Sequence, residues 1–244
     1  MEEIPYRNTK LLVQTIPKGT LLFRLTKDPD TRGVPLKDGT RCIIPNFNVY
    51  FYPTPFVMKH AAGKYQAQLM KGKKMYAYVL TKDVKVIRLL LPSKYARQHK
   101  GTKRNFIKRC SNVPKGCMPN ELNFRDPCLS DTIVEKYPEI VGMMGVAVYD
   151  AYVVNKSLSH KRTKKVRRFF SLATDAEGTT GIPELVLHPL HKRPSKQIIV
   201  NPTDKLEMNY KLIKPLSFNE SELINFMDKH ATFNPETLYY TYTA

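Results

Sequence analysis

The chain has no tryptophan, and it has too few acidic residues to balance its basic ones. Its 244 residues include 40 Lys and Arg but only 21 Asp and Glu, which gives a formal net charge of +19. Tyrosine and phenylalanine, with 14 and 11 residues, supply the aromatic bulk. Because a charge of this size promotes binding to polyanions through counterion release, we expect nucleic acid or an acidic protein surface as a partner.

Long apolar runs are also missing. The longest extends only from Ile140 to Tyr149 and contains two glycines, so it is too short to cross a bilayer. The first residues, Met1 to Pro5, are acidic and polar, whereas a secretion signal has an apolar stretch behind a basic region. The sequence therefore predicts a cytoplasmic protein without a membrane span.

Cysteine is scarce, and its spacing is unlike that of a metal knuckle. In a chain without an export signal, Cys42, Cys110, Cys117 and Cys128 are expected to be reduced thiols. No two of them form a Cys-x-x-Cys pair, and structural zinc sites almost always contain a close pair. We therefore expect no metal, with a zinc site formed by the last three cysteines and either His99 or Cys42 as the alternative.

The hydrophobic pattern predicts more strands than helices. Met75–Leu91 is rich in β-branched residues and is typical of two strands or one long bent strand, and Gln197–Val200 predicts a short strand. Val57–Met70 and Glu220–His230 carry apolar residues at helical spacing. Ile140–Val154 predicts a helical turn that leads into a buried strand. Together these patterns predict a compact α+β domain with a mixed or antiparallel sheet.

We expect this domain to occupy residues 1–215, with a basic insertion around residues 92–130. Residues 216–244 are expected to form a C-terminal helix and tail.

Two stretches without any acidic residue concentrate the positive charge. The first also contains Tyr95 and Phe106, and a mixture of cationic and aromatic side chains is suited to a nucleic-acid backbone. The alternative is an ordinary solvated surface, because most charge runs are solvated. The residues expected to bind nucleic acid or another partner are Lys94, Arg97, Lys100, Lys103, Arg104, Lys108 and Arg109, followed by Lys161, Arg162, Lys164, Lys165, Arg167 and Arg168.

Three distant segments each place a functional side chain on a predicted strand. The turn and apolar run that begin at Ile16 end in Arg24. The segment Asn48–Phe56 alternates aromatic and β-branched residues and contains Thr54. A loop with two glycines precedes the apolar run that opens on Glu184.

This order resembles the arginine, serine/threonine, glutamate layout of the ADP-ribosyltransferase superfamily. The resemblance covers Lys10–Leu90 and Phe169–Val200. It implies a split-sheet ADP-ribosyltransferase-like core that uses NAD as its cofactor.

The resemblance also implies a role for each site residue. Arg24 would hold a phosphate of NAD, because a guanidinium binds a pyrophosphate with two parallel hydrogen bonds. Thr54, Tyr52 and Tyr65 would shape the nicotinamide pocket. Glu184 would hydrogen-bond the nicotinamide ribose and stabilise the positive charge that develops at the anomeric carbon.

The chain departs from the family pattern at two places. Pro53 and Pro55 flank Thr54, where the family carries a serine-rich motif. Ile182 stands two residues before Glu184, where members that modify arginine carry a second glutamate.

Two functions remain open at this point. The first is an NAD-dependent mono-ADP-ribosyltransferase that modifies a protein or nucleic-acid target. The second is a non-enzymatic basic structural, virion or nucleic-acid-binding protein built on a degenerate version of the fold. The lysine- and tyrosine-rich composition resembles that of proteins of large cytoplasmic DNA viruses, which would place the chain in the host cytoplasm or the virion. A metal-dependent nuclease ranks last, because carboxylates such as Asp126, Asp131 and Asp150 are scattered.

Overall fold

The computed structural model describes residues 2–6, 9–45, 47–53, 55–58, 71–88, 136–148, 151–153, 181–217, 220–234, 237 and 239–244. Within them the fold is mostly sheet, with one α-helix, α6 (Glu220–His230). The strands are β1 (Glu2–Tyr6), β2 (Thr9–Ile16), β3 (Leu21–Thr26), β4 (Val34–Pro35), β5 (Arg41–Ile43), β6 (Val49–Phe51), β7 (Phe56–Met58), β8 (Lys74–Leu80), β9 (Val84–Arg88), β10 (Ile140–Val148), β11 (Ala151–Val153), β12 (Gly181–Leu187), β13 (Ile198–Val200), β14 (Tyr210–Leu216), β15 (Ala231–Phe233) and β16 (Tyr240–Tyr242).

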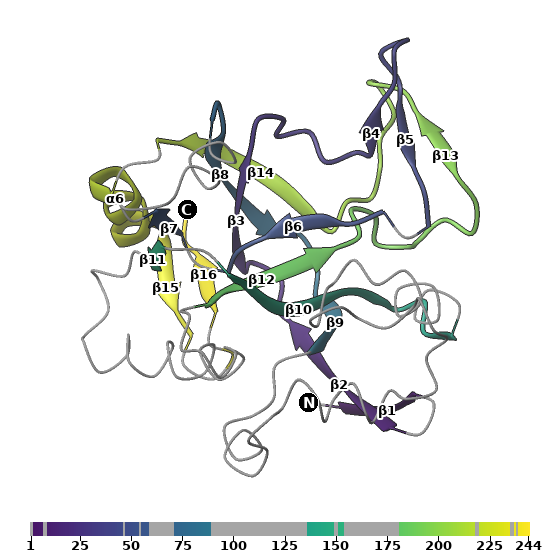
Figure 1. Cartoon of the computed structure of the whole chain (residues 1–244), viewed down its shortest axis with the longest axis horizontal. Coiled ribbons are helices and arrows are strands. Elements are labelled where there is room, and N and C mark those ends of the chain that lie inside the picture. The colour runs from purple at the N-terminus through teal and green to yellow at the C-terminus, as the bar shows by residue number, and fades with distance from the viewer. Residues whose placement is uncertain are drawn as a thin grey trace.

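The largest sheet has six strands in the order β1-β2-β9-β10-β12-β6 (Figure 1). The pair β9 and β10 is parallel and the other pairs are antiparallel, so the sheet is mixed, as the sequence predicts. One face of this sheet packs against the main core, and the other carries a smaller cluster built around Val13, Ile87 and Val186.

A second sheet of three strands, in the order β14-β8-β3, joins the first at one point. There Phe23 N donates to Tyr52 O at 2.8 Å, and Tyr52 N donates to Phe23 O at 2.6 Å. Tyr52 directly follows β6, the last strand of the large sheet. This bridge places β6, at the edge of the six-stranded sheet, next to β3, at the edge of the sheet β14-β8-β3.

The C-terminal segment belongs to the same core. Leu223, Phe226 and Met227 of α6 are buried, and the Phe226 ring meets Phe23 edge-on at 6.1 Å between centroids. The hairpin β15–β16 returns the chain to β3, where Thr241 forms a bridge with Thr20. Residues 220–242 therefore close one end of the three-stranded sheet.

A third, smaller sheet, β13-β5-β4, stands apart from the other two in Figure 1. One of its faces packs on Leu190 through Ile43 and Val200. Among the described segments, no helix is long and apolar enough to cross a membrane.

Several predicted elements are confirmed. Met75–Leu91 contains the two strands β8 and β9, and Glu220–His230 is helix α6. The strand prediction for Gln197–Val200 is confirmed by β13.

Two local predictions are wrong. Val57 and Met58 lie in β7, which pairs with β11 almost a hundred residues later, so a long-range pairing overrides their helical spacing. The remainder of the predicted helix, residues 59–70, lies outside the described residues. The stretch Ile140–Val154 begins directly as strand β10 at Ile140, where a helical turn was predicted. The reason is that β10 runs between β9 and β12 and hydrogen-bonds to both.

Candidate functional site

The structure brings the three predicted motif strands side by side. Arg24 in β3 follows Phe23, which bridges to Tyr52. Tyr52 extends β6, which pairs with β12 in the register Phe51 opposite Leu185. Glu184 is the residue before Leu185, so the strands of the arginine, the aromatic segment and the glutamate are successive neighbours.

Only some residues of the predicted site are among the described residues. Tyr52 is 5% exposed and belongs to the core. The backbone of Glu184 lies in β12 opposite Gly145 of β10. Thr54 and Tyr65 lie outside the described residues.

Both predicted basic clusters also fall outside the described residues. They comprise Lys94, Arg97, Lys100, Lys103, Arg104, Lys108, Arg109, Lys161, Arg162, Lys164, Lys165, Arg167 and Arg168.

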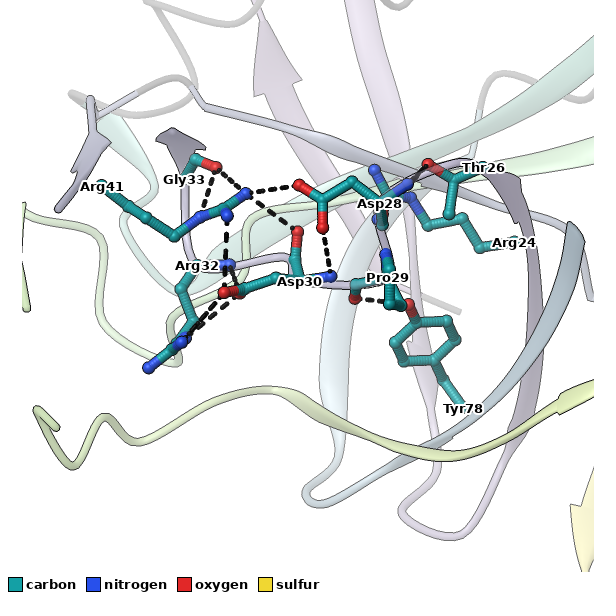
Figure 2. Close-up of polar contacts among 9 residues, drawn as sticks. All are labelled: Arg24, Thr26, Asp28, Pro29, Asp30, Arg32, Gly33, Arg41 and Tyr78. Carbon is teal, nitrogen blue, oxygen red and sulfur yellow. Dashed lines mark hydrogen bonds and ion pairs between the residues drawn. The ribbon is translucent and has the colours of Figure 1, made fainter. Parts of the chain in front are cut away.

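Arg24 is half-buried in β3, two residues before the strand ends and a tightly folded loop begins. Its Nη1 donates to the main-chain carbonyl of Asp28 at 2.8 Å (Figure 2). Thr26 Oγ1 donates to the same carbonyl at 3.0 Å and accepts from Asp28 N at 3.1 Å. The Tyr78 hydroxyl donates to the carbonyl of Pro29 at 2.7 Å. The loop after β3 is therefore fastened to the sheet by side chains of β3 and β8.

Two further arginines hold the rest of this loop. Arg41 Nη2 lies 2.9 Å from Asp28 Oδ2 and donates to the carbonyl of Gly33 at 2.8 Å. Arg32 Nη2 lies 2.9 Å from Asp30 Oδ2, and Figure 2 shows these contacts together. Burial raises the pKa of Asp30, but the hydrogen bonds from Arg32 and the nearby charge of Arg41 outweigh burial and hold it below its usual range.

The three arginines that contact the loop after β3 differ in how their charge is balanced. Arg32 and Arg41 each have a carboxylate within 3 Å. Among the described residues, Arg24 has no carboxylate partner and donates to a neutral carbonyl. Since a half-buried cation without a counterion attracts anions strongly, Arg24 is the anion-binding candidate of the three.

A groove lies beside the loop that follows β3. It has a volume of about 660 Å³, and its walls include the loop Pro29–Arg32, Met208 and Lys211. Tyr78 and Tyr210 lie beneath it and are almost completely buried, and burial raises the pKa of both tyrosines. The size falls in the usual range of small-molecule sites.

A second buried polar group follows β12. His188 is fully buried, and Leu190 N donates to its Nδ1 at 3.1 Å. Burial and the neighbouring charge of Arg193 lower the pKa of His188 to about 4, so the ring is neutral at physiological pH. Asn209 Nδ2 donates to the carbonyls of His188 at 3.0 Å and Leu190 at 2.9 Å. These contacts tie the end of β12 to the start of β14.

The sequence analysis missed the loop network and the groove. The signal for the network was the run of turn-forming residues in Asp28-Pro-Asp-Thr-Arg32, because aspartate and proline favour local turns. The groove had no sequence signal, because its walls come from three distant segments.

Cys42 is half-buried in β5, and the other three cysteines and His99 lie outside the described residues. In the described part of the chain, no group of three His, Cys, Asp or Glu side chains could hold a metal ion.

Comparison with protein-family models, with curated proteins and with solved structures finds no match to this chain. The functional argument therefore depends on the geometry described above.

Proposed function

We propose that the chain is an ADP-ribosyltransferase-like protein that uses NAD to modify a protein or nucleic-acid target. The observation that carries this proposal is the half-buried charge of Arg24, on a strand that adjoins those of Tyr52 and Glu184. The junction of a six-stranded and a three-stranded sheet at Tyr52 supports the split-sheet core that the family resemblance implies.

The residues present suit NAD in two respects. Arg24 donates to a neutral carbonyl and has no carboxylate partner among the described residues, so its guanidinium can bind a phosphate. The groove of about 660 Å³ beside the loop after β3 falls in the size range of small-molecule sites. When bound, NAD would supply a glycosidic bond whose cleavage releases nicotinamide and transfers ADP-ribose.

In this proposal each residue of the chain has one task. Arg24 binds a phosphate, and its contact with the Asp28 carbonyl orients the guanidinium. Tyr52 is fixed in the core and forms part of the floor of the site. Thr54 and Tyr65 complete the nicotinamide pocket, and the carboxylate of Glu184 stabilises positive charge on the ribose.

A second candidate function is supported by the net charge of the chain. The net charge of +19 favours a non-enzymatic protein that binds nucleic acid or a virion component on the same fold. It differs from the first candidate in one measurable respect, because it requires no NAD.

The test is to incubate the purified chain with NAD, to measure nicotinamide release, and to titrate NAD by calorimetry. The transferase predicts both binding and release, with release abolished in a Glu184→Gln variant. Absence of NAD binding to the parent chain would overturn the transferase and favour the second candidate.

A further inference from the structure

Four lysines from two segments meet at one corner of the three-stranded sheet. Lys27 follows the last residue of β3, Lys71 and Lys73 flank Gly72 in the turn that leads into β8, and Lys74 is the first residue of β8. Thr26 of β3 pairs with Lys74 of β8, so the two segments leave the sheet side by side. We call these four residues the lysine corner.

The geometry of the turn holds these like charges close together. Gly72 has a φ of 72°, which produces a tight turn between Lys71 and Lys73. The Lys27 side chain lies across this turn: an ideal Cβ on Gly72 would be 3.3 Å from its Cε and 3.8 Å from its Nζ. Because like charges repel, such a cluster is unfavourable unless an anion occupies it.

No acid of the described residues neutralises the corner. Lys82 and Lys85 each pair with a glutamate at 3.0 Å, but none of the four corner lysines has a carboxylate of the described residues within ion-pair distance. The nearest acid in sequence, Asp28, is engaged by Arg41 at 2.9 Å. The charge of the corner is therefore available to an external anion.

An aromatic ring lies between the corner and Arg24. Tyr76 pairs directly with Arg24 across β3 and β8, and Lys74 is two residues before it. Residues at this spacing, and residues directly opposite each other, share one face of a sheet. Tyr76 is half-buried: it packs partly against the main core and lies on the same sheet face as Lys74 and Arg24.

We propose that the lysine corner and Tyr76 form a docking surface for single-stranded nucleic acid. The lysines would neutralise the phosphates, and an unpaired base would stack on Tyr76. This inference deepens the proposed function, on which it rests for the role of the bound strand as the target of the transferase.

An acidic protein is the poorer fit to this surface. The exposed large apolar side chains of the described chain are Val34, Leu36, Ile44, Ile199 and Leu212. None of them is in the corner, whereas the centre of a protein–protein interface is rich in apolar contacts.

The test compares two triple variants that lose the same charge. The corner variant carries Lys27→Gln, Lys71→Gln and Lys74→Gln. The control carries Lys37→Gln, Lys196→Gln and Lys205→Gln, three exposed lysines in the connections around the sheet β13-β5-β4. Binding to a fluorescent thymidine 20-mer is followed by anisotropy over a range of salt concentrations, in the absence of NAD.

The corner variant should reduce the log–log salt slope by about 2, since each phosphate contact with a single strand contributes about 0.7. The control should change it by less than about 0.5 if its lysines touch no phosphate. Tyr76→Leu should weaken binding to the single strand by about tenfold and leave binding to a duplex of equal length unchanged, while Tyr76→Phe retains the affinity.

Two results would overturn the inference. Equal losses in the corner and control variants would show that overall charge, and not this surface, binds the strand. A parent chain that ignores the 20-mer and binds polyglutamate would point to an acidic protein partner.

The outcome is separable from that of the transferase. Nicotinamide release by the corner variant should equal that of the parent, because none of the three lysines is placed at the NAD site. A chain that binds the strand through the corner but hydrolyses no NAD would keep the docking surface and overturn the transferase. A chain that hydrolyses NAD, and whose corner and control variants bind the strand equally, would keep the transferase and overturn the docking surface.

Discussion

Phe23 and Tyr52 exchange two main-chain hydrogen bonds, of 2.8 and 2.6 Å, across the junction of the two main sheets. Arg24 is the next residue after Phe23, so the position of its backbone relative to β6 is set by these contacts. Its guanidinium is held separately, by the hydrogen bond from Nη1 to the Asp28 carbonyl, and a side chain held in advance loses less conformational entropy when it binds a ligand. The junction therefore brings the strand of Arg24 next to β6, which pairs with the strand of Glu184.

The pairing of β10 with β12, which places Glu184, depends on a glycine. An ideal Cβ on Gly142 would lie 2.2 Å from the Val186 carbonyl oxygen and 2.6 Å from Leu187 Cδ2. We therefore expect Gly142→Ala to force the strands apart and to lower the free energy of unfolding by about 3 kcal/mol or more. Gly39→Ala is the control: φ there is 84°, but nothing lies within 4 Å of the added Cβ, so its cost should be about 1 kcal/mol. Urea unfolding measures both, and equal costs would contradict the steric argument.

Removal of the Arg24 guanidinium should weaken NAD binding. Arg24→Ala is expected to lose about 1.5–3 kcal/mol of binding free energy, the contribution of a charge-assisted hydrogen bond to a phosphate. Thr26→Val is the matched control, since it deletes the two hydrogen bonds to Asp28 in the same loop and keeps the guanidinium. Calorimetry should show almost unchanged affinity in the control. A similar loss in both variants would assign the effect to the shape of the loop.

The carboxylate of Glu184 is expected to act on turnover more than on binding. Glu184→Gln keeps the size of the side chain and removes its charge, so nicotinamide release should fall by about two orders of magnitude while NAD affinity changes little. Glu2→Gln, at an exposed glutamate paired with Lys85, should leave turnover near that of the parent. Unchanged turnover in Glu184→Gln would move the catalytic role to another residue.

Local sequence patterns predicted an element correctly where its contacts in the folded chain favour the same conformation. Helix α6 follows from the spacing of Leu223, Phe226 and Met227, which are buried in the main core, where Phe226 meets Phe23 of β3. The strands β8 and β9 follow from their β-branched residues. The helical spacing of Val57 and Met58 predicted the wrong element, because pairing with β11 decided the conformation.

The candidate site was predictable only as residue types on strands. The order of Arg24, Thr54 and Glu184 resembles a known layout of three strands, and the backbone register makes the strands of Arg24, Tyr52 and Glu184 successive neighbours. The contact of Arg24 with the Asp28 carbonyl was not predictable, because it depends on the conformation of the loop after β3. The groove was not predictable either, since Pro29, Tyr78 and Met208 meet only in the folded chain.

Acid should destabilise the fold through His188. Its pKa is about 4 in the folded chain because of burial and the charge of Arg193, whereas an unfolded histidine has a pKa of about 6.5. The unfolded chain therefore binds more protons than the folded chain between these values. His188 contributes its full stabilisation above about pH 6.5 and loses it as the pH falls towards 4. Between pH 7 and 4.5 this loss should be about 2–3 kcal/mol.

The measurement is the free energy of unfolding in urea at pH 7 and at pH 4.5, for the parent and for a His188→Gln variant. The variant is expected to be less stable at pH 7, because glutamine cannot reproduce the contact of the buried ring with Leu190. Its further loss at pH 4.5 should be smaller than that of the parent by about 2–3 kcal/mol, since no group at this position gains a proton. His191→Gln, at an exposed histidine three residues later, should keep the full acid sensitivity of the parent. The same acid sensitivity in His188→Gln as in the parent would show that protonation elsewhere unfolds the chain.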